Sequence, residues 1–426
     1  MKSIRALSFV ACAAIYLGPA VGPALAVSLT EKAIDGVQVY HYSWTDSKGR
    51  PRSVSLKKEG AGNSGHGGYA VRATYQYLDG GAWKTKIVKS GSAGEGFGYF
   101  VSHERERLFS DGKRGTIAQK IFHIDDSPLG RGFAVTADKF TPGSQLRFIR
   151  FSLAYPRYGT IAANGIDPET GDDKPRLGTS PALFAKYSLP VRIYWYFQDG
   201  ADYPRIRTQV SLSNLPGPDR VSFDVRGPYG KLDFDGGANA IEQVRWGDSY
   251  HFASTTTPLT RNSKWTWNSV NSSNRYLSLR AKGFEMGLVS LGGSRLNDGY
   301  ADGRGQTSST YFNGNGCSFQ SQLIPCDYEW PYQASQYELP YDNRNGTTTS
   351  EKMAWGSSPY LGTSLTSTYD GRASHPFDGF PANKTISYDI CLVLGTTIDG
   401  GRTRAVARDA KLGTASCART TPLQGV

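Results

Sequence analysis

Histidine, cysteine and methionine are scarce in this chain, with 6 His, 5 Cys and 3 Met among 426 residues. So few histidines leave little material for a multi-histidine metal site, and no Cys-x-x-Cys pair with a nearby His indicates zinc. Charged residues make up only 20% while aromatic residues reach 12%, which argues against disorder. After the first 26 residues no apolar run approaches the ~18 residues that a membrane helix needs.

The motifs of several familiar enzyme classes are also absent. The sequence has no G-x-S-x-G nucleophile elbow, no H-E-x-x-H zinc motif and no phosphate-binding or dinucleotide-binding glycine loop in a suitable context. Asp298 and Asp302, with glycines beside them, faintly suggest a calcium loop, but the Asp-x-Asp-x-Asp-Gly spacing is missing and a solvated turn explains them better. We therefore predict no cofactor, with calcium left open.

Strands dominate what is present. Alternating residues over 69–77, a turn at Asp79-Gly80-Gly81 and a returning run over 83–88 predict a hairpin. Helices are expected only around 181–186 and near Glu31. Further β-prone runs occupy 146–155, 191–197, 205–213, 220–225, 276–280, 287–291 and 386–394. These runs predict an all-β chain folded as a large antiparallel two-sheet β-sandwich with few short helices.

The N-terminus resembles a secretory signal peptide. Lys2 and Arg5 precede an apolar stretch, and Ala24-Leu25-Ala26 forms an A-x-A cleavage site. We expect residues 1–26 to be removed and 27–426 to form a single large sandwich domain. This domain would have no membrane span and would be exported to the periplasm or the extracellular space. The sequence does not indicate an oligomeric state.

The four cysteines that follow the leader suggest two disulfides in an exported protein. The economical pairing joins Cys317 to Cys326 and Cys391 to Cys417, although three connectivities are possible. A reduced pair is the alternative.

The charge balance is basic. Without the two basic residues of the leader, 46 Lys and Arg face 37 Asp and Glu, a net charge of +9. Export argues against nucleic acid as a partner, so cell-surface polymers, uronic-acid polysaccharides and anionic membranes are the candidates for attraction. A merely basic, soluble surface would give the same count.

A family resemblance points to sugars. The runs VRIYWYFQDGADYPRIRTQVSLSNL and DRVSFDVRGPYGKLDF resemble consecutive long strands of the supersandwich in galactose-mutarotase-like domains. The later segments YEWPYQ and ISYDICLVLG resemble the closing strands of such domains. The resemblance implies a carbohydrate ligand, because these domains are common in proteins that handle sugars. The mutarotase histidine–glutamate pattern and the α/α-toroid of many polysaccharide lyases are not found.

The densest cluster of reactive groups runs from Arg245 to His251. In elimination on a uronic-acid sugar, a cation such as Arg245 neutralises the substrate carboxylate so that the C5 proton becomes acidic. Tyr250 or His251 could then act as base, a tyrosine as acid, and Asp248 as the orienting group. Trp246 would offer a platform for a sugar ring. The alternative is a strand with core aromatics and an Arg245–Asp248 ion pair.

A second basic segment contains His103, Arg105 and Arg107. Strand alternation would place all three on one face, where they could bind an anionic chain. A solvated edge strand whose charges block edge-to-edge association explains them equally well.

Aromatic residues could bind sugars elsewhere in the chain. Trp265 and Trp267 share a face of the short run KWTWN, and Trp330 could extend the platform, because the C–H faces of sugars pack on indole rings. Core packing is the alternative for each.

Paired carboxylates supply a competing chemistry. Glycoside hydrolysis needs two acids about 5–9 Å apart, and Asp233, Asp235 and Glu242 form the reserve set. Surface positions explain any given pair of acids as well.

Together these patterns predict a secreted protein that cleaves glycosidic bonds of a polysaccharide, by elimination in preference to hydrolysis. The preference rests on the positive charge, the 25 tyrosines and the proximity of Arg, Tyr and His. A glycoside hydrolase and a non-catalytic polysaccharide-binding protein of the envelope are the alternatives.

Overall fold

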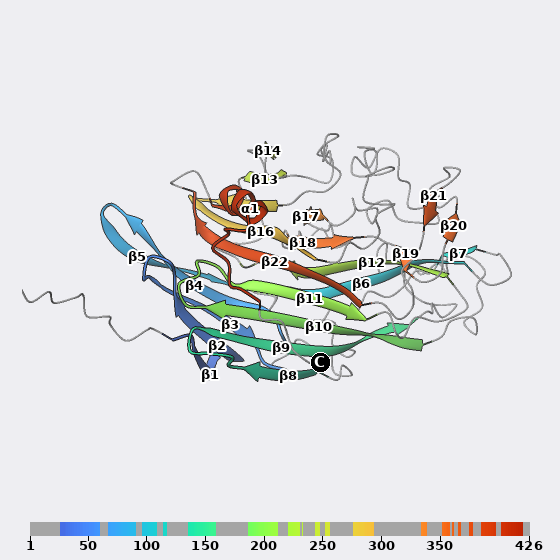
Figure 1. Cartoon of the computed structure of the whole chain (residues 1–426), viewed down its shortest axis with the longest axis horizontal. Helices are drawn as coiled ribbons and strands as arrows, with labels where there is room; N and C mark the ends of the chain where they lie inside the picture. Colours follow the sequence, from blue (N-terminus) through green and yellow to red (C-terminus); the bar gives the residue numbers. More distant parts are fainter. Residues whose placement is uncertain are drawn as a thin grey trace, which may run out of the picture.

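The chain is seen in a computed structural model. The structure describes residues 26–59, 67–90, 96–108, 114–116, 135–158, 186–211, 220–230, 232, 243–247, 252–255, 276–293, 334–338, 352–357, 360–361, 365–367, 375–377, 385–397 and 402–420. Within these ranges two large, twisted sheets lie face to face along the long axis of the molecule (Figure 1).

The first sheet has eleven strands and contains most of the N-terminal third of the chain. Its main path runs β1-β2-β3-β4-β6-β12-β18-β17, with β5 beside β4, β7 beside β6 and β19 beside β12. The strands are β1 (Ser28–Ile34), β2 (Val37–Thr45), β3 (Pro51–Lys57), β4 (Ala70–Asp79), β5 (Ala82–Lys89), β6 (Phe97–Leu108), β7 (Arg114–Thr116), β12 (Arg220–Gly230), β17 (Ala334–Glu338), β18 (Lys352–Ser357) and β19 (Tyr360–Leu361).

The second sheet has nine strands in the order β14-β13-β15-β16-β22-β11-β10-β9-β8. A small ribbon of β20 (Leu365–Ser367) and β21 (His375–Phe377) and the helix α1 (Thr403–Lys411) complete the described elements. The nine strands are β8 (Val135–Phe140), β9 (Leu146–Tyr158), β10 (Lys186–Gln198), β11 (Arg205–Ser211), β13 (Gln243–Gly247), β14 (Phe252–Thr255), β15 (Tyr276–Ala281), β16 (Phe284–Gly293) and β22 (Thr385–Thr396).

All strand pairings in these ranges are antiparallel, so the predicted antiparallel two-sheet β-sandwich is confirmed. The hairpin expected from the alternation over 69–77 is β4–β5, in which Asp79 pairs with Ala82. The strands expected at 191–197 and 205–213 are the long β10 and its neighbour β11.

Of the two predicted helices, one is wrong and the other lies almost entirely outside the described residues. A helix near Glu31 is wrong, because Glu31 lies in β1 and pairs with Tyr40 of β2, so sheet pairing overrides local helix propensity. Residues 181–185 lie outside the described ranges. The helix α1 was not predicted, although its sequence TRAVARDAK is rich in the good helix formers Ala and Arg. Val406 and Ala407 are buried where α1 packs on the nine-stranded sheet.

The core between the sheets is an aromatic layer centred on β10. Alternation along β10 sends Ile193, Trp195 and Phe197 inward, where all three are buried. The ring of Phe197 stacks on Tyr42 of β2 at 4.4 Å between centroids. The indole Nε1 of Trp195 donates a hydrogen bond of 2.9 Å to the carbonyl oxygen of Gly68 in the opposite sheet. Both sheets therefore share one core.

Two glycines make room for inward-facing rings of the opposite sheet, Gly98 for Trp195 and Gly68 for Phe151. A methyl group at Gly98 would lie 2.5 Å from the Trp195 ring, and Gly98 has a φ of +117°, a conformation that side-chain-bearing residues rarely adopt. A methyl group at Gly68 would lie 2.9 Å from Phe151. The backbone at Gly98 approaches Trp195 closely, and the backbone at Gly68 approaches Phe151 closely, because neither position has a side chain.

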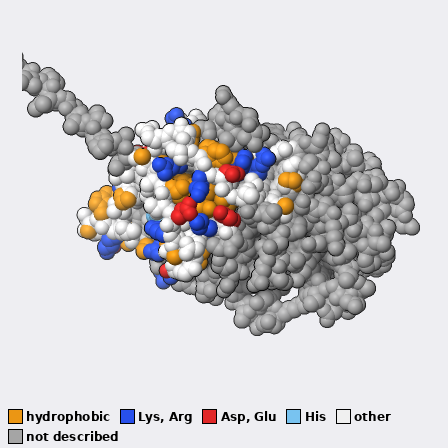
Figure 2. All heavy atoms as spheres, turned by 90° about the horizontal axis from the view of Figure 1, so that it is seen from below, with side chains coloured by type: hydrophobic (Ala, Val, Ile, Leu, Met, Phe, Trp, Pro, Cys, Tyr) orange, Lys and Arg blue, Asp and Glu red, His pale blue; other side chains and the backbone are white. Residues whose placement is uncertain are grey.

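Ion pairs connect the two sheets at the edge formed by β1 and β8. Glu31 of β1 accepts hydrogen bonds from Lys58 at 2.6 Å and from Lys139 of β8 at 2.7 Å. Seen from the side of β1 and β8, basic and acidic side chains are intermixed on the described surface (Figure 2). The hydrogen bonds from the two lysines lower the pKa of Glu31 to about 2. Because all three groups are at least partly exposed, the contacts contribute little to stability.

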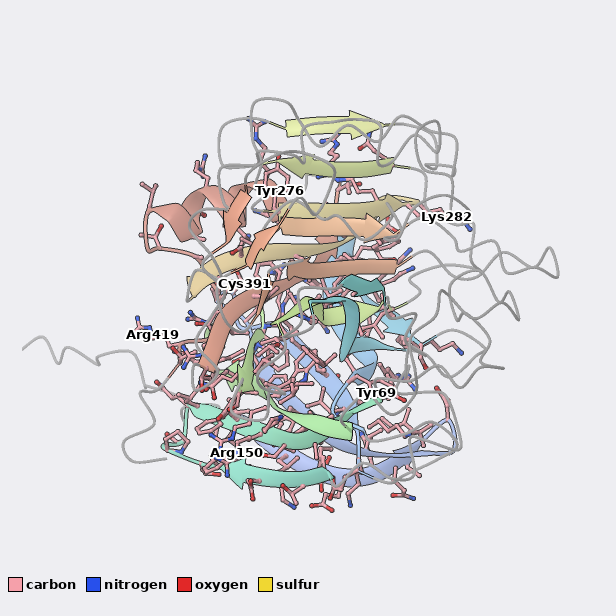
Figure 3. All side chains as sticks on the ribbon, turned by 90° about the vertical axis from the view of Figure 1, so that its right-hand side faces the viewer. Tyr69, Arg150, Tyr276, Lys282, Cys391 and Arg419 are labelled. Atoms are coloured by element: carbon pink, nitrogen blue, oxygen red, sulfur yellow. A yellow bond between two sulfur atoms is a disulfide. The ribbon has the colours of Figure 1, made fainter. Side chains whose placement is uncertain are left out.

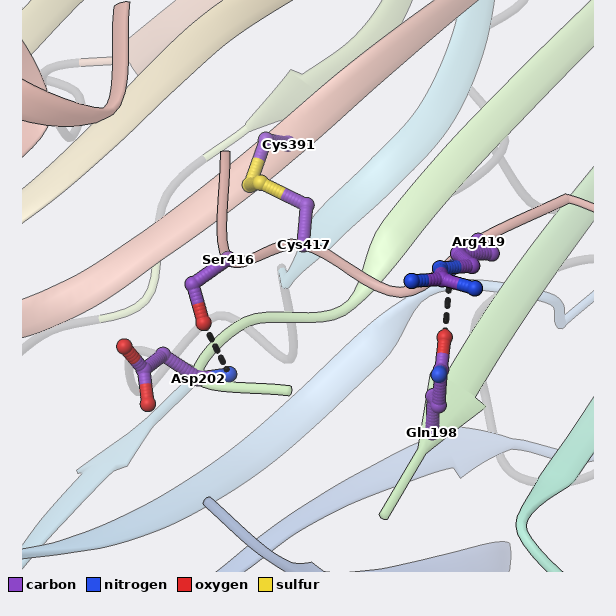
Figure 4. Close-up of a disulfide and its surroundings, with 6 residues drawn as sticks. All are labelled: Gln198, Asp202, Cys391, Ser416, Cys417 and Arg419. Atoms are coloured by element: carbon purple, nitrogen blue, oxygen red, sulfur yellow. Dashed lines mark hydrogen bonds between the residues drawn. A yellow bond between two sulfur atoms is a disulfide. The ribbon is translucent and has the colours of Figure 1, made fainter. Parts of the chain in front are cut away.

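The last described segment is fastened to the sheet by a disulfide. Cys391 of β22 is bonded to Cys417, with the Cα atoms 6.0 Å apart, which confirms this predicted pair (Figure 4). The backbone N–H of Tyr203 donates to the carbonyl oxygen of Ser416, and that of Ala418 donates to the carbonyl oxygen of Tyr203. Cys317 and Cys326 lie outside the described residues, so their pairing stays a prediction.

We expect Gly98→Ala to lower the free energy of unfolding by about 2–4 kcal/mol, because the methyl group meets the Trp195 ring and the backbone is strained. Urea unfolding followed by tryptophan fluorescence measures the change. Gly143→Ala is the matched control, since its methyl group would meet nothing within 4 Å, and it should change stability by less than about 0.5 kcal/mol. Equal effects at both positions would contradict the close approach.

We expect the double variant Cys391→Ala, Cys417→Ala to lose about 3.5 kcal/mol of unfolding free energy, the chain-entropy value for a sequence separation of 26. Urea unfolding with and without a reducing agent measures it. The reducing agent should lower the unfolding free energy of the natural chain by breaking this bond. The double variant lacks the bond and should not show that loss. A natural chain that is indifferent to reduction would contradict the contribution of the disulfide.

Candidate functional site

The predicted Arg245 segment lies at one end of the nine-stranded sheet. β13 lies between β14, the edge strand, and β15. Gly247 pairs with Phe252 on one side and with Tyr276 on the other, so Arg245 and Trp246 sit near the end of the strand. Tyr276 lies toward this end of the sheet, and Arg150 of β9 lies toward the opposite end (Figure 3).

Arg245 is half-buried and is held by an amide. Its Nε donates a hydrogen bond of 2.6 Å to Oε1 of Gln243, two residues earlier in β13. Among the described residues this is its one hydrogen-bonding partner. The bond uses the Nε side of the guanidinium, and no carboxylate of a described residue binds the edge formed by its two Nη nitrogens. That edge is the fork that binds carboxylates through two parallel hydrogen bonds.

Arg245 belongs to a cluster of charged and polar side chains on the outer face of the sheet. Directly paired residues of neighbouring strands share a face, and Arg245 pairs with Ser278 while Gln243 pairs with Arg280. Arg280 and Ser278 both reach Glu285 of β16, at 3.3 Å and 2.8 Å. The Arg245 cluster consists of Gln243, Arg245, Ser278, Arg280 and Glu285.

Glu285 connects this cluster to the helix. Its side chain is fully buried and accepts hydrogen bonds from the backbone N–H groups of Arg402 and Thr403 and from Oγ1 of Thr403. The N-terminal end of a helix carries partial positive charge and unpaired N–H groups, so a carboxylate there is stabilising. Glu285 thus anchors the first turn of α1 to β16.

The cluster carries an excess of positive charge. It contains two guanidinium groups and one carboxylate, and Glu285 is shared between Arg280 and the start of α1. Burial lowers the pKa of Arg280, and the nearby charge of Arg245 lowers it further, while Glu285 opposes both effects. A bound anion would offset this repulsion between two cations.

Other arginines of the sandwich are paired with carboxylates instead. Arg205 and Arg207 of β11 both bind Asp389 of β22, at 3.0 Å and 2.8 Å. Arg150 binds Asp138 at 2.8 Å. Unlike these three arginines, Arg245 is fixed by an amide, which holds the guanidinium without neutralising its charge.

The predicted basic row on β6 lies in the other sheet. His103 and Arg107 pair with Asp224 and Val221 of β12, so β6 runs inside the eleven-stranded sheet between β4 and β12 and is not an edge strand. The pairing shifts register opposite Glu104 and Glu106. Unbroken alternation of His103, Arg105 and Arg107 was assumed, and a β-bulge at this point interrupts it.

The remaining candidates cannot be placed. Trp246 lies on β13, and the structure describes the course of its backbone. Residues outside the described ranges include three of the proposed catalytic groups, the reserve acids, three tryptophans and the weak calcium candidates: Asp248, Tyr250, His251, Asp233, Asp235, Glu242, Trp265, Trp267, Trp330, Asp298 and Asp302.

Two structural findings bear on ligands. In the part of the chain that the structure describes, no group of three or more His, Cys, Asp or Glu side chains is arranged to hold a metal ion. No helix of the described segments is long and apolar enough to cross a membrane.

Sequence reasoning missed the partners of Arg245. Glu285 and Arg280 lie in the short runs FEMGLV and LSLRA, and nothing in either run shows that these charged side chains are buried together. The weak signal was a charged residue inside an otherwise apolar strand. Burial of such a residue requires a partner, which only the register of β15 and β16 identifies.

The chain was compared with known proteins. No family model and no curated protein matches it. An alpha-mannosidase from Enterococcus faecalis V583 aligns with 93% of this chain and 32% of its own length, at 8% identity and a TM-score of 0.40. An alpha-N-acetylgalactosaminidase from Bifidobacterium bifidum aligns with 85% of this chain and 36% of its own length, at 10% identity and a TM-score of 0.32.

The chain thus spans about a third of the length of these two structures, both of which are named for activities on sugars. At scores and identities this low, the likeness establishes neither a shared activity nor a shared substrate.

We expect Glu285→Gln to lower the free energy of unfolding by about 3 kcal/mol, because it leaves the buried guanidinium of Arg280 without its carboxylate. Chemical unfolding measures the change. Glu31→Gln removes an exposed carboxylate that also has two cationic partners, so it should cost less than about 1 kcal/mol. A cost at Glu285 no larger than at Glu31 would count against the buried anchor.

Proposed function

We propose that this chain is an exported enzyme that cleaves glycosidic bonds in an acidic polysaccharide by elimination, with Arg245 binding the carboxylate of the sugar. The observation that carries the proposal is the geometry of Arg245. Gln243 holds its Nε, the Nη edge has no carboxylate partner among the described residues, and Arg280 adds a second positive charge to the same face. A uronic-acid carboxylate has the charge and the planar two-oxygen shape that this edge recognises.

The proposed chemistry needs a cation at the carboxylate. Charge neutralisation there stabilises the carbanion-like state that forms when a base removes the C5 proton. The electrons of the C5–H bond then form a C4–C5 double bond as the C4–O bond breaks. The leaving oxygen takes up a proton and becomes a new sugar hydroxyl. Preorganised positive groups aimed at developing negative charge are a major source of rate enhancement.

The proton-transfer groups proposed for this step are Tyr250 and His251, with Asp248 as the orienting residue. They follow Gly247 directly in the sequence, and β13 and β14 are paired from Gly247 and Phe252 onward. The four residues 248–251 therefore connect adjacent antiparallel strands close to Arg245 along the chain. Short connections on a rigid sheet are common positions for catalytic groups.

Export is proposed together with this activity. The disulfide between Cys391 and Cys417 is compatible with an oxidising compartment, where such bonds persist. The leader-like N-terminus and the basic charge balance support the same assignment. An acidic polymer outside the cytoplasm would be attracted to such a surface at low salt.

The test is incubation with polygalacturonate, alginate, hyaluronan and neutral dextran. Elimination would produce both the ultraviolet absorbance of an unsaturated uronate and new reducing ends. New reducing ends without ultraviolet absorbance would contradict elimination. They would indicate hydrolysis, for which the reserve acids Asp233, Asp235 and Glu242 are the candidates. Retention of a polymer without any new ends would contradict an enzyme and favour a binding protein.

We expect Arg245→Gln to lower kcat/KM on the cleaved polymer by about 10²-fold, since one preorganised cation is lost. The variant should fold, because removing Arg245 takes a like charge away from Arg280. Arg150→Gln is the matched control, as Arg150 is neutralised by Asp138 and lies at the opposite end of the sheet. Initial cleavage rates of the natural chain and the two variants measure the effect. Equal losses of kcat/KM for both variants would exclude a specific role for Arg245.

A further inference from the structure

A second feature lies on the outer face of the eleven-stranded sheet. Strand pairing aligns two rows of side chains across β1 to β5, and each row contains directly opposed residues. One row consists mainly of hydroxyl groups, and the other ends in two cations. The rows are Ser28, Ser43, Ser53, Thr74 and Ile87, and Thr30, His41, Ser55, Arg72 and Lys89.

The hydroxyl row is ordered by its own hydrogen bonds. Ser28 bonds Ser43 and Ser53 bonds Thr74, both at 2.6 Å between hydroxyl oxygens. In the neighbouring row, Nδ1 of His41 lies 2.9 Å from the hydroxyl of Ser55. These bonds fix polar side chains of this face in place, with Ser53 and Ser55 themselves buried.

Large hydrophobic side chains stand exposed where this face continues onto the β4–β5 hairpin. Trp83 is 54% exposed, its cross-strand partner Leu78 is 52% exposed, and Ile87 is 43% exposed. Alternation along β5 and pairing with β4 put all three on the same face as Arg72 and Lys89. The hairpin projects at the left end of Figure 1, and hydrophobic and basic side chains gather at that end in Figure 2.

The exposed indole of Trp83 is held by a cation–π contact with Arg50. The guanidinium carbon of Arg50 lies 5.4 Å from the centre of the Trp83 ring. Arg50 in turn binds the buried carboxylate of Asp46 at 2.7 Å. This Asp46–Arg50–Trp83 chain fixes a ring that nevertheless stays more than half exposed, which lowers the entropy lost when a ligand packs on it.

The charges on this face, at the end of β5 away from the indole, are mostly positive. Lys32, Arg72 and Lys89 lie there, and among the described residues Asp35, 3.8 Å from Arg72, is an acidic group close to them. Burial, with the charges of Lys32 and Arg72, lowers the pKa of His41 to about 4, so this imidazole is neutral at pH 7. The face therefore complements a negatively charged ligand.

We propose that the outer face of β4 and β5 is a second binding site for an acidic polysaccharide, with a sugar ring stacked on Trp83 and a uronate carboxylate bound by Arg72 and Lys89. Trp83 and Lys89 are six residues apart on one strand, which is about 20 Å, so the ligand is an extended stretch of several sugars. The ligand class rests on the proposed function, but the site lies on the other sheet and shares no residue with the Arg245 cluster.

The pattern favours a polysaccharide over an anionic membrane. A membrane-inserting hairpin needs a contiguous apolar tip. Here the tip contains Asp79, which is paired with Lys84, followed by two glycines. The polar pair Gln76 and Thr85 also separates Trp83 from Ile87 on the same face. Alternating ring-stacking, amide, hydroxyl and cationic groups instead match the alternating apolar and polar groups of a sugar chain.

The test is binding of the natural chain and Trp83→Ala to immobilised polygalacturonate, alginate, hyaluronan and dextran. We expect Trp83→Ala to weaken binding to the acidic polymer about tenfold, or about 1.4 kcal/mol. Trp83→Phe, which keeps an aromatic ring, should restore most of the affinity. Leu412→Ala is the matched control, because it removes an exposed hydrophobic side chain at the end of α1 and should leave binding unchanged.

Three outcomes would overturn the proposal. These are unchanged acidic-polymer binding by Trp83→Ala, an equal loss for Leu412→Ala, and a loss confined to phosphatidylserine vesicles, which would identify a membrane contact. The cleavage assay separates this proposal from the proposed function, because Trp83→Ala should cleave short acidic oligosaccharides at the natural rate. Absence of cleavage with Trp83-dependent binding intact would defeat only the proposed function.

Discussion

The insertion of Trp195 between the sheets is the contact on which the rest of the sandwich depends. Its ring occupies space that Gly98 leaves open, and its indole N–H bonds the backbone of the opposite sheet at Gly68. This contact sets how closely β4 and β6 approach β10, and the aromatic stack of Phe197 on Tyr42 continues the same layer. Alternation along β10 turns Trp195 and Phe197 inward, and it turns Tyr194 and Tyr196 to the other face, where both tyrosines are buried in a cluster with Phe148.

The charged groups of the sandwich have two different roles. Carboxylates such as Asp46 and Asp389 each bind two arginines and thereby fix turns and strands in place. Arg245 is held by an amide and keeps its charge. Because Arg245 and Trp83 belong to different sheets, a polymer long enough to contact both would be tethered at one while it moved at the other. Such tethering raises the effective concentration of the chain at the second position.

The sequence was informative where a pattern is local. Two-residue alternation identified the β4–β5 hairpin, a β-prone run identified the long β10, and the economical pairing of the cysteines included the bond between Cys391 and Cys417. It failed at Glu31, where pairing with β2 decides the conformation, and at α1, whose helix is stabilised by packing and by the distant Glu285. The sequence also did not indicate that the side chain of Trp83 is exposed. Alternation predicts which face of a strand a side chain lies on, but it does not predict which residues cover that face. The partners of Arg245 and the bulge in β6 could be identified only from the register of the paired strands.

The position of β22 has a consequence for the order in which the protein is made. This strand, one of the last in the sequence, lies inside the nine-stranded sheet between β16 and β11. Until it has been synthesised, β11 and β16 present unpaired edges, and pairings that span almost two hundred residues cannot form. The chain must therefore remain incompletely folded for most of its synthesis, and the unpaired strand edges expose it to strand-mediated association during that time.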